Sequence, residues 1–213
     1  MISCLLVAVA ATKKTIYCCD AFSRGAKIGT TQATTEHRPD GTIQVTAEEN
    51  IRLNGSVRHG LQVEVFAKGG RPISEEYDQT VGAHKQSALI VYSQTTVRVE
   101  KRMDGKVLST NSFPIPSDKV LINGARHWFH GRAPKVGESA TYYRLSRTGK
   151  WLTEHRKFLG RDKITFEGRM VSANIIETTH GREWADDAGV AYRAESKIGS
   201  VDLTLIRTRI IKS

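Results

Sequence analysis

The stretch "KIGTTQATTEHRPDGTIQVTAEENIRLN", residues 27–54, contains two alternating runs joined by the turn residues Pro39, Asp40 and Gly41. In the second run, Ile43 and Val45 fall on one face of an extended chain, and the polar residues between them fall on the other. Alternation with a period of two is typical of a half-buried antiparallel strand. The stretch therefore predicts a β-hairpin and favours an all-β fold.

The same pattern recurs along most of the chain. Alternating runs are separated by turn signals at Gly69-Gly70, Asp104-Gly105, Thr148-Gly149, Glu167-Gly168 and Gly199-Ser200. No alternation of strands with helices and no repeat of fixed length is present. We expect an all-β, mainly antiparallel domain over residues 12–213, with about ten to eleven strands in a curved meander sheet or half-barrel. Residues 114–138 lack the pattern, and we expect one short helix or loop plug there, within 117–130.

The net charge of the chain indicates which classes of binding partner suit it. The 213 residues carry a formal net charge of +10, which makes anionic lipid headgroups, membrane surfaces or acidic envelope glycans natural partners. The Lys and Arg residues are scattered, however, with no run longer than a pair such as Lys13-Lys14. Scattered charge favours a generic solvated surface over a dedicated anion-binding face.

The N-terminal run "ISCLLVAVAA", residues 2–11, has the length of a secretory apolar region and closes on Ala8-Val9-Ala10, a small-x-small cleavage pattern. It predicts a signal peptide over residues 1–11 and export to the periplasm or cell envelope. The run is shorter than the roughly 20 residues that span a bilayer. Cys18 and Cys19 would point to opposite faces of a strand, so we expect packing residues and no disulfide between them.

Sequence signatures of catalysis are absent. The chain has no Walker loop, dinucleotide-binding glycine fingerprint, HExxH helix, G-x-S-x-G elbow or CxxC pair. We therefore expect no cofactor, no metal and no enzymatic activity. Two carboxylate-bearing pairs, Glu75-Glu76 and Glu154-His155, lie on alternating runs, where one member of each faces solvent, and we interpret them as a solvated face.

Two aromatic segments are candidate ligand-binding sites. "RHWFHGR" places Trp128 and Phe129 between His127 and His130, and we expect the two rings to fill the concave side of the sheet. "YYRLSRTGKWLTEHRKF", residues 142–158, interleaves basic and aromatic side chains as single-strand nucleic-acid binders do. We interpret it instead as an amphipathic hairpin with a basic outer face and do not expect nucleic acid as a partner. The predicted ligand-binding residues are Trp128, Phe129, Tyr142 and Trp151.

The stretch "THGREWADDAGVAYRAES", residues 179–196, gathers His180, Glu183, Asp186 and Asp187, which could form a metal or acid-base site. The same letters also fit the tip of a hairpin, with Asp186, Asp187 and Gly189 where turn chemistry requires them. We favour the turn, and no partner for His180 can be named from the sequence.

The order of these segments resembles an uncharacterised family of exported bacterial β-domains. The motifs that carry the resemblance are "GAKIGTTQ", "PDGTIQVTAEENIRL", "GGRPIS", "PKVGES" and "GREWADDAGVAYRAES", and it covers nearly all of residues 15–212. The positions that match are Gly29, Asp40-Gly41, Gly137, Trp184, Asp186 and Gly189. The family is similar in fold to the lipoprotein carriers LolA and LolB and is related to segments that precede transglutaminase-like domains. The resemblance implies a curved half-barrel that shelters a lipid, an acyl chain, a peptide or a glycan strand, and implies no catalytic residues.

Three functions remain open at this point. The first is an exported, non-enzymatic binding or carrier domain that holds an apolar ligand, such as a lipid or acyl chain, on its concave face. The second is a hydrolase assembled from His127, His130 and acidic residues such as Glu183 and Asp186. The third is a structural protein that binds anionic envelope glycan. We favour the first.

Overall fold

The computed structural model describes residues 12–53, 55–122, 129, 132–187, 189–198 and 201–213, and these contain fourteen β-strands. The first eight are β1 (Lys13–Ser23), β2 (Ala26–His37), β3 (Ile43–Leu53), β4 (Ser56–Phe66), β5 (Pro72–Val81), β6 (His84–Tyr92), β7 (Thr96–Met103) and β8 (Lys106–Pro114). The other six are β9 (Ser139–Leu145), β10 (Trp151–Phe166), β11 (Arg169–Thr178), β12 (Gly181–Ala185), β13 (Ala191–Ile198) and β14 (Val201–Lys212).

All the described strands form one antiparallel sheet in the order β8-β7-β6-β5-β4-β3-β2-β1-β14-β13-β12-β11-β10-β9. Strands that are consecutive along the chain are neighbours in the sheet, except β8 and β9, and β1 also pairs with β14, so the first and last strands lie together in the middle. The edge strands are β8 and β9, and the sheet does not close between them. The predicted all-β antiparallel meander is confirmed, but the sheet has more strands than the ten or eleven expected.

Two strand boundaries also differ from those that the alternating runs of the sequence indicate. Residues 87–102 divide into β6 and β7 at a turn over Ser93–Thr96, where the Ser93 hydroxyl accepts a bond from the Thr96 backbone N–H. Conversely, the runs 151–160 and 162–168 are largely a single strand, β10, which continues through a register shift between Phe158 and Gly160. A bulge of this kind bends a strand without ending it.

The predicted turn residues occupy their expected conformations. Asp104 and Gly105 both have positive φ, at 49° and 79°, as the two-residue hairpin between β7 and β8 requires. Gly41 has φ 83° and donates to the Arg38 carbonyl, while the Asp40 carboxylate accepts from the Thr42 N–H. These turns fix the register of the strands on either side.

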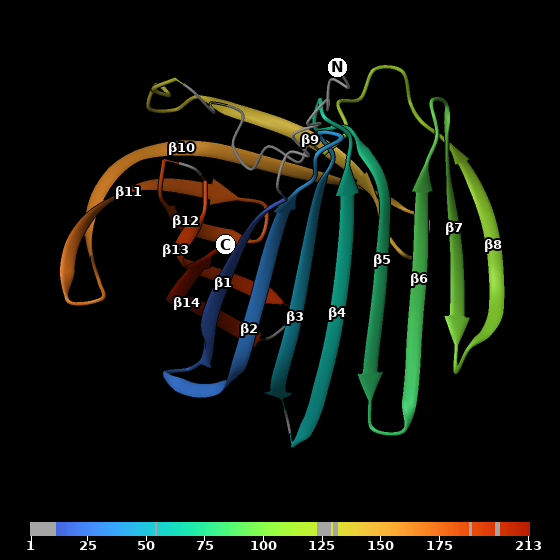
Figure 1. Cartoon of the computed structure of the whole chain (residues 1–213), viewed down its shortest axis with the longest axis horizontal. Helices are drawn as coiled ribbons and strands as arrows, with labels where there is room; N and C mark the ends of the chain where they lie inside the picture. The colour runs from blue at the N-terminus through green and yellow to red at the C-terminus, as the bar shows by residue number, and fades with distance from the viewer. Residues whose placement is uncertain (1–11, 54, 123–128, 130–131, 188, 199–200) are drawn as a thin grey trace, which may run out of the picture.

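The sheet folds back on itself, so that its two halves pack together. In Figure 1, β1–β8 stand side by side as one wall, and β9–β11 run across behind them. The main core lies at this contact: Ile90, Tyr92, Val97 and Val99 of the N-terminal half enclose Leu145 of β9. Phe113, Ile115, Leu121 and Trp151 pack around this cluster. The chain thus builds a two-layered core from a single sheet.

The connection between the edge strands runs through residues 115–138, part of which lies outside the described residues. Leu121 forms a parallel bridge with Tyr143 of β9, so this segment covers the β9 edge. No helix occurs in the described part of the connection or elsewhere among the described residues, so the expected short helix is not observed there. Accordingly, the described residues include no helix long and apolar enough to cross a membrane.

Candidate functional site

The predicted ligand-binding residues have different surroundings. Phe129 is 3% exposed and packs in a small core with Phe158 and Ile176, its ring centroid 5.8 Å from that of Phe158. Trp151 is half-buried against the main core, and Tyr142 is half-buried on β9, where burial raises the pKa of its hydroxyl. Trp128 lies outside the described residues. Their role in ligand binding stays a prediction, although Phe129 already has protein contacts around its ring.

The acidic cluster of residues 179–196 separates into four independent pairs. Asp186 contacts Arg207 (Oδ2 to Nη1, 3.3 Å), and Asp187 contacts Arg161 (Oδ1 to Nη2, 2.7 Å). Glu183 lies 3.7 Å from Arg156, and His180 lies 3.8 Å from Glu154. Asp186, Gly189 and Val190 make the turn contacts that were favoured from sequence: Gly189 has φ 84°, and the Asp186 Oδ1 accepts from the Val190 N–H.

Asp186 also has a structural role beyond the turn. Its partner Arg207, on β14, is 3% exposed and donates to the Val190 carbonyl. The guanidinium lies over the rings of Phe166 and Tyr192, at 4.8 and 4.0 Å from their centroids. A buried cation of this kind needs its carboxylate. The cluster therefore joins β10, β13 and β14 and is structural.

The hydrolase reading has no site among the described residues. No group of three or more His, Cys, Asp and Glu side chains within that part of the chain could hold a metal ion. His127 and His130 lie outside the described residues. Cys18 and Cys19 are free thiols, and burial raises the pKa of the Cys19 thiol, which disfavours a reactive thiolate.

A cleft of about 380 Å³ lies where the turn between β9 and β10 meets the N-terminal half. Tyr77 of β5, Ala88 of β6 and Lys101 of β7 are directly opposite one another in the sheet and share the face that the cleft opens on. The residues that line it are Tyr77, Gln86, Ser87, Ala88, Lys101, Arg102, Met103, Leu108, Ser146, Arg147 and Thr148.

A bulge in β8 supplies the apolar rim of the cleft. Lys101 pairs with Ser109 and Arg102 pairs with Val107, which leaves Leu108 as the extra residue. Bulges redirect side chains, and Leu108 lies in the cleft lining with its side chain 62% exposed. Together with Met103, it offers apolar surface that the protein itself does not cover.

The β9–β10 turn places Arg147 on the side of the cleft that faces β5–β8. Gly149 permits this approach because a Cβ there would lie 2.4 Å from the Phe113 ring, and its φ of +82° suits glycine. The Arg147 guanidinium stacks on the Tyr77 ring, with its central carbon 3.5 Å from the ring centroid. This cation–π contact connects the two halves of the sheet across the cleft.

The charge of the cleft has one sign. Lys101, Arg102 and Arg147 are cationic, and none of the described lining residues carries a carboxylate. Arg102 is paired with Glu100, Nε to Oε1 at 2.7 Å, whereas Lys101 has no hydrogen bond or ion pair within the described part of the chain. Lys101 and Arg147 are therefore available to an anion.

A buried carboxylate lies beside the cleft. Glu75, two residues before Tyr77 on the same face of β5, is only 9% exposed and accepts a bond from Gln62 Nε2 at 3.2 Å. Burial raises the pKa of its carboxyl to about 7, helped by the like charge of Glu64 and opposed by Arg144 and Arg147. Tyr92 also faces this group, and burial raises the pKa of its hydroxyl to about 12.

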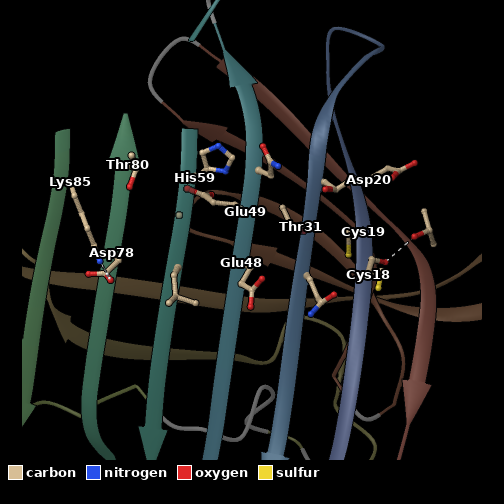
Figure 2. Close-up of a pocket in the computed structure, with 16 residues that line it drawn as sticks. Cys18, Cys19, Asp20, Thr31, Glu48, Glu49, His59, Asp78, Thr80 and Lys85 are labelled. Carbon is tan, nitrogen blue, oxygen red and sulfur yellow. Dashed lines mark hydrogen bonds and ion pairs between the residues drawn. The ribbon is translucent and has the colours of Figure 1, made fainter. Parts of the chain in front are cut away.

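The opposite face of the N-terminal half carries an open polar groove of about 740 Å³ (Figure 2). It runs across the strands between two rows of paired side chains, with the backbone of Gly60 in its floor. One row is Asp20, Thr30, Asn50, His59, Thr80 and Lys85, and the other is Cys18, Gln32, Glu48, Leu61 and Asp78. Asp78 is neutralised by Lys85 at 2.8 Å, and Asp20 by Lys27 at 2.8 Å. The groove is open and polar, and its described lining holds the carboxylates of Asp20, Glu48, Glu49 and Asp78 and one cation, Lys85.

The sequence did not indicate the cleft, because its lining residues come from four strands and a turn that the register brings together. No family model matches this chain, and no curated protein or solved structure matches it significantly. The resemblance to exported β-domains is therefore supported only as far as an all-β, antiparallel, single-sheet domain, and the family assignment stays a prediction.

Proposed function

We propose that this protein is a non-enzymatic binding or carrier domain that holds an amphipathic anion, an apolar chain with a negatively charged end, in the cleft beside Arg147. The apolar chain lies against Tyr77, Met103 and Leu108. The negative end lies between Lys101 and Arg147. The apolar run at residues 2–11 supports a location of the protein in the periplasm or cell envelope, where fatty acids and lipids are present.

The observation that carries the proposal is the combination of exposed apolar surface and cations without a carboxylate in one cleft. Small-molecule sites are typically concave and mostly apolar, with a few polar groups that fix orientation, and begin at about 300 Å³. The cleft is of this size, whereas the larger groove on the other face has no apolar floor.

Binding of decanesulfonate, kept below its micelle concentration and measured by calorimetry, tests the proposal. The sulfonate stays charged at every working pH, and decyl maltoside supplies a neutral control of the same chain length. We expect Lys101→Gln and Arg147→Gln each to weaken sulfonate binding about tenfold, since a hydrogen bond to a charged group contributes about 1.5 kcal/mol or more. Maltoside binding should change little.

Arg98→Gln is the matched control. Arg98 is an exposed residue of the same strand as Lys101, three positions away and therefore on the opposite face. Its loss should leave sulfonate affinity unchanged. Absence of sulfonate binding to the wild-type protein, or equal weakening by Arg98→Gln and Lys101→Gln, would contradict the proposal.

A further inference from the structure

The buried Glu75 and the cleft share one cation. Arg147 stacks on Tyr77 at the cleft wall, and its charge also acts on the Glu75 carboxyl two residues away on β5. The other nearby cation, Arg144, is already paired with Glu154, Nε to Oε1 at 3.2 Å. Arg144 and Arg147 therefore both act on Glu75, and Arg147 is the one of the two that also lines the cleft.

The other groups that face Glu75 are acidic or neutral, apart from Arg144. On β4, Glu64 lies directly opposite Glu75, and Gln62 donates from one amide nitrogen to both carboxyls, at 3.2 Å each. On β6, Tyr92 contributes a hydroxyl, and the C-terminal half contributes only Arg144 and Arg147. Glu75 is thus a buried acid beside the cleft, and Arg147 is the cation that both lines the cleft and acts on the Glu75 carboxyl.

We propose that Glu75 determines the selectivity of the cleft between anionic and neutral amphiphiles: its ionised carboxylate offsets the charge of Arg147, and its protonated form leaves that charge to the ligand. This inference rests on the proposed function of the cleft. By linkage, an anion bound beside Arg147 favours protonation of Glu75, and protonation of Glu75 favours the anion to the same extent.

The direction of the pH effect follows from the state of Glu75. Because burial raises its pKa to about 7, the carboxyl is mostly ionised at pH 8 and mostly neutral at pH 5.5. Affinity for an anion therefore rises as the pH falls across this range. Both arginines stay charged, the Tyr92 hydroxyl with its pKa of about 12 stays neutral, and none of the described lining residues is a histidine.

The test measures decanesulfonate and decyl maltoside binding at pH 5.5 and pH 8. We expect the sulfonate to bind the wild-type protein about fivefold more tightly at pH 5.5, the lower end of typical coupling between sites. Glu75→Gln, which keeps an acceptor for Gln62, should bind it equally tightly at both pH values. Glu64→Gln removes a like charge that raises the pKa of Glu75, so it should move the midpoint to lower pH and keep the response. Maltoside binding should not respond.

Glu76→Gln is the matched control, since Glu76 is exposed on the opposite face of the same strand. It should keep the wild-type pH response. Sulfonate affinity that is equal at both pH values, or a full pH response in Glu75→Gln, would overturn the role of Glu75 while leaving the cleft as a binding site. Absence of sulfonate binding at either pH would overturn both.

Discussion

Replacing Glu75 by glutamine should make the protein more stable at neutral and alkaline pH. The folded protein keeps the Glu75 carboxyl 9% exposed and raises its pKa from 4.5 to about 7. Between these two pH values the folded state holds a proton that the unfolded chain has released. Stability therefore falls as the pH rises through this window and remains reduced above it. Glutamine has no charge to bury, so it removes this loss.

The magnitude follows from the two pKa values. One pH unit of difference corresponds to about 1.4 kcal/mol, so the burial of ionised Glu75 costs roughly 3 kcal/mol at pH 8. For a domain of about 200 residues this corresponds to an increase of roughly 6 to 12 °C in the melting temperature. At pH 4.5 the Glu75 carboxyl is protonated in the folded protein and about half protonated in the unfolded chain, so the variant and the wild-type protein should have nearly equal stability.

Urea unfolding followed by circular dichroism at pH 4.5, 6 and 8 measures this difference. Glu76→Gln provides the control, because Glu76 is the next residue of the same strand and lies exposed on the other face. Its effect should stay within about 0.5 kcal/mol at each pH. The reasoning is refuted if Glu75→Gln is no more stable than the wild-type protein at pH 8, or if its advantage is the same at pH 4.5.

Three further substitutions test the packing of the fold away from the cleft, each by urea unfolding. Arg207→Met leaves Asp186 without its cation and should cost roughly 3 kcal/mol, whereas Arg209→Met on the exposed side of β14 should cost less than about 0.5 kcal/mol. Gly181→Ala places a Cβ 2.0 Å from the Glu195 carbonyl oxygen and should lower the free energy of unfolding by about 3 kcal/mol or more. At Gly168 a Cβ meets no atom within 4 Å, so Gly168→Ala should lower it by only about 1 kcal/mol. Equal losses in the two variants would contradict this geometry. Phe129→Ala should lower the free energy of unfolding by roughly 3–5 kcal/mol and leave decanesulfonate binding to the folded protein unchanged. Weaker sulfonate binding in this variant would indicate that Phe129 belongs to the ligand site.

The turns could be predicted because their chemistry is local. Asp104-Gly105, Gly41 and Gly189 need positive φ or an Asx-type bond, and few other residues supply these. The turn at Ser93 was missed because it uses Ser and Thr hydroxyls, which are equally common within strands. The strand boundary at Ser93 was therefore missed because its turn chemistry is weak, and the order of the strands was not affected.

The pairing of Glu75 and Glu76 shows the limit of pattern reading within a strand. Alternation correctly places one of the two in solvent, and Glu76 is the exposed one. It cannot say what covers the other face. The cover is the β9–β10 turn, some 70 residues further along the chain, which brings Arg144 and Arg147 toward Glu75. The pKa of Glu75 is thus raised because a segment distant in sequence helps to bury it, and nothing near Glu75 in the sequence indicates this burial.

The cations of the cleft are hidden in the sequence for the same reason. Arg98 and Lys101 lie on one strand, three residues apart, so they must face opposite sides of the sheet. The sequence does not show which face is solvated, because an exposed basic residue on a strand does not lower the stability of the protein and can therefore lie on either face. Once the C-terminal half packs on the Lys101 face, Arg98 remains an ordinary surface charge, and Lys101 becomes a half-buried cation without a partner in the described chain. An unpaired ammonium beside exposed apolar surface is the combination that a bound amphipathic anion complements, and this is the physical reason to propose an anion in the cleft.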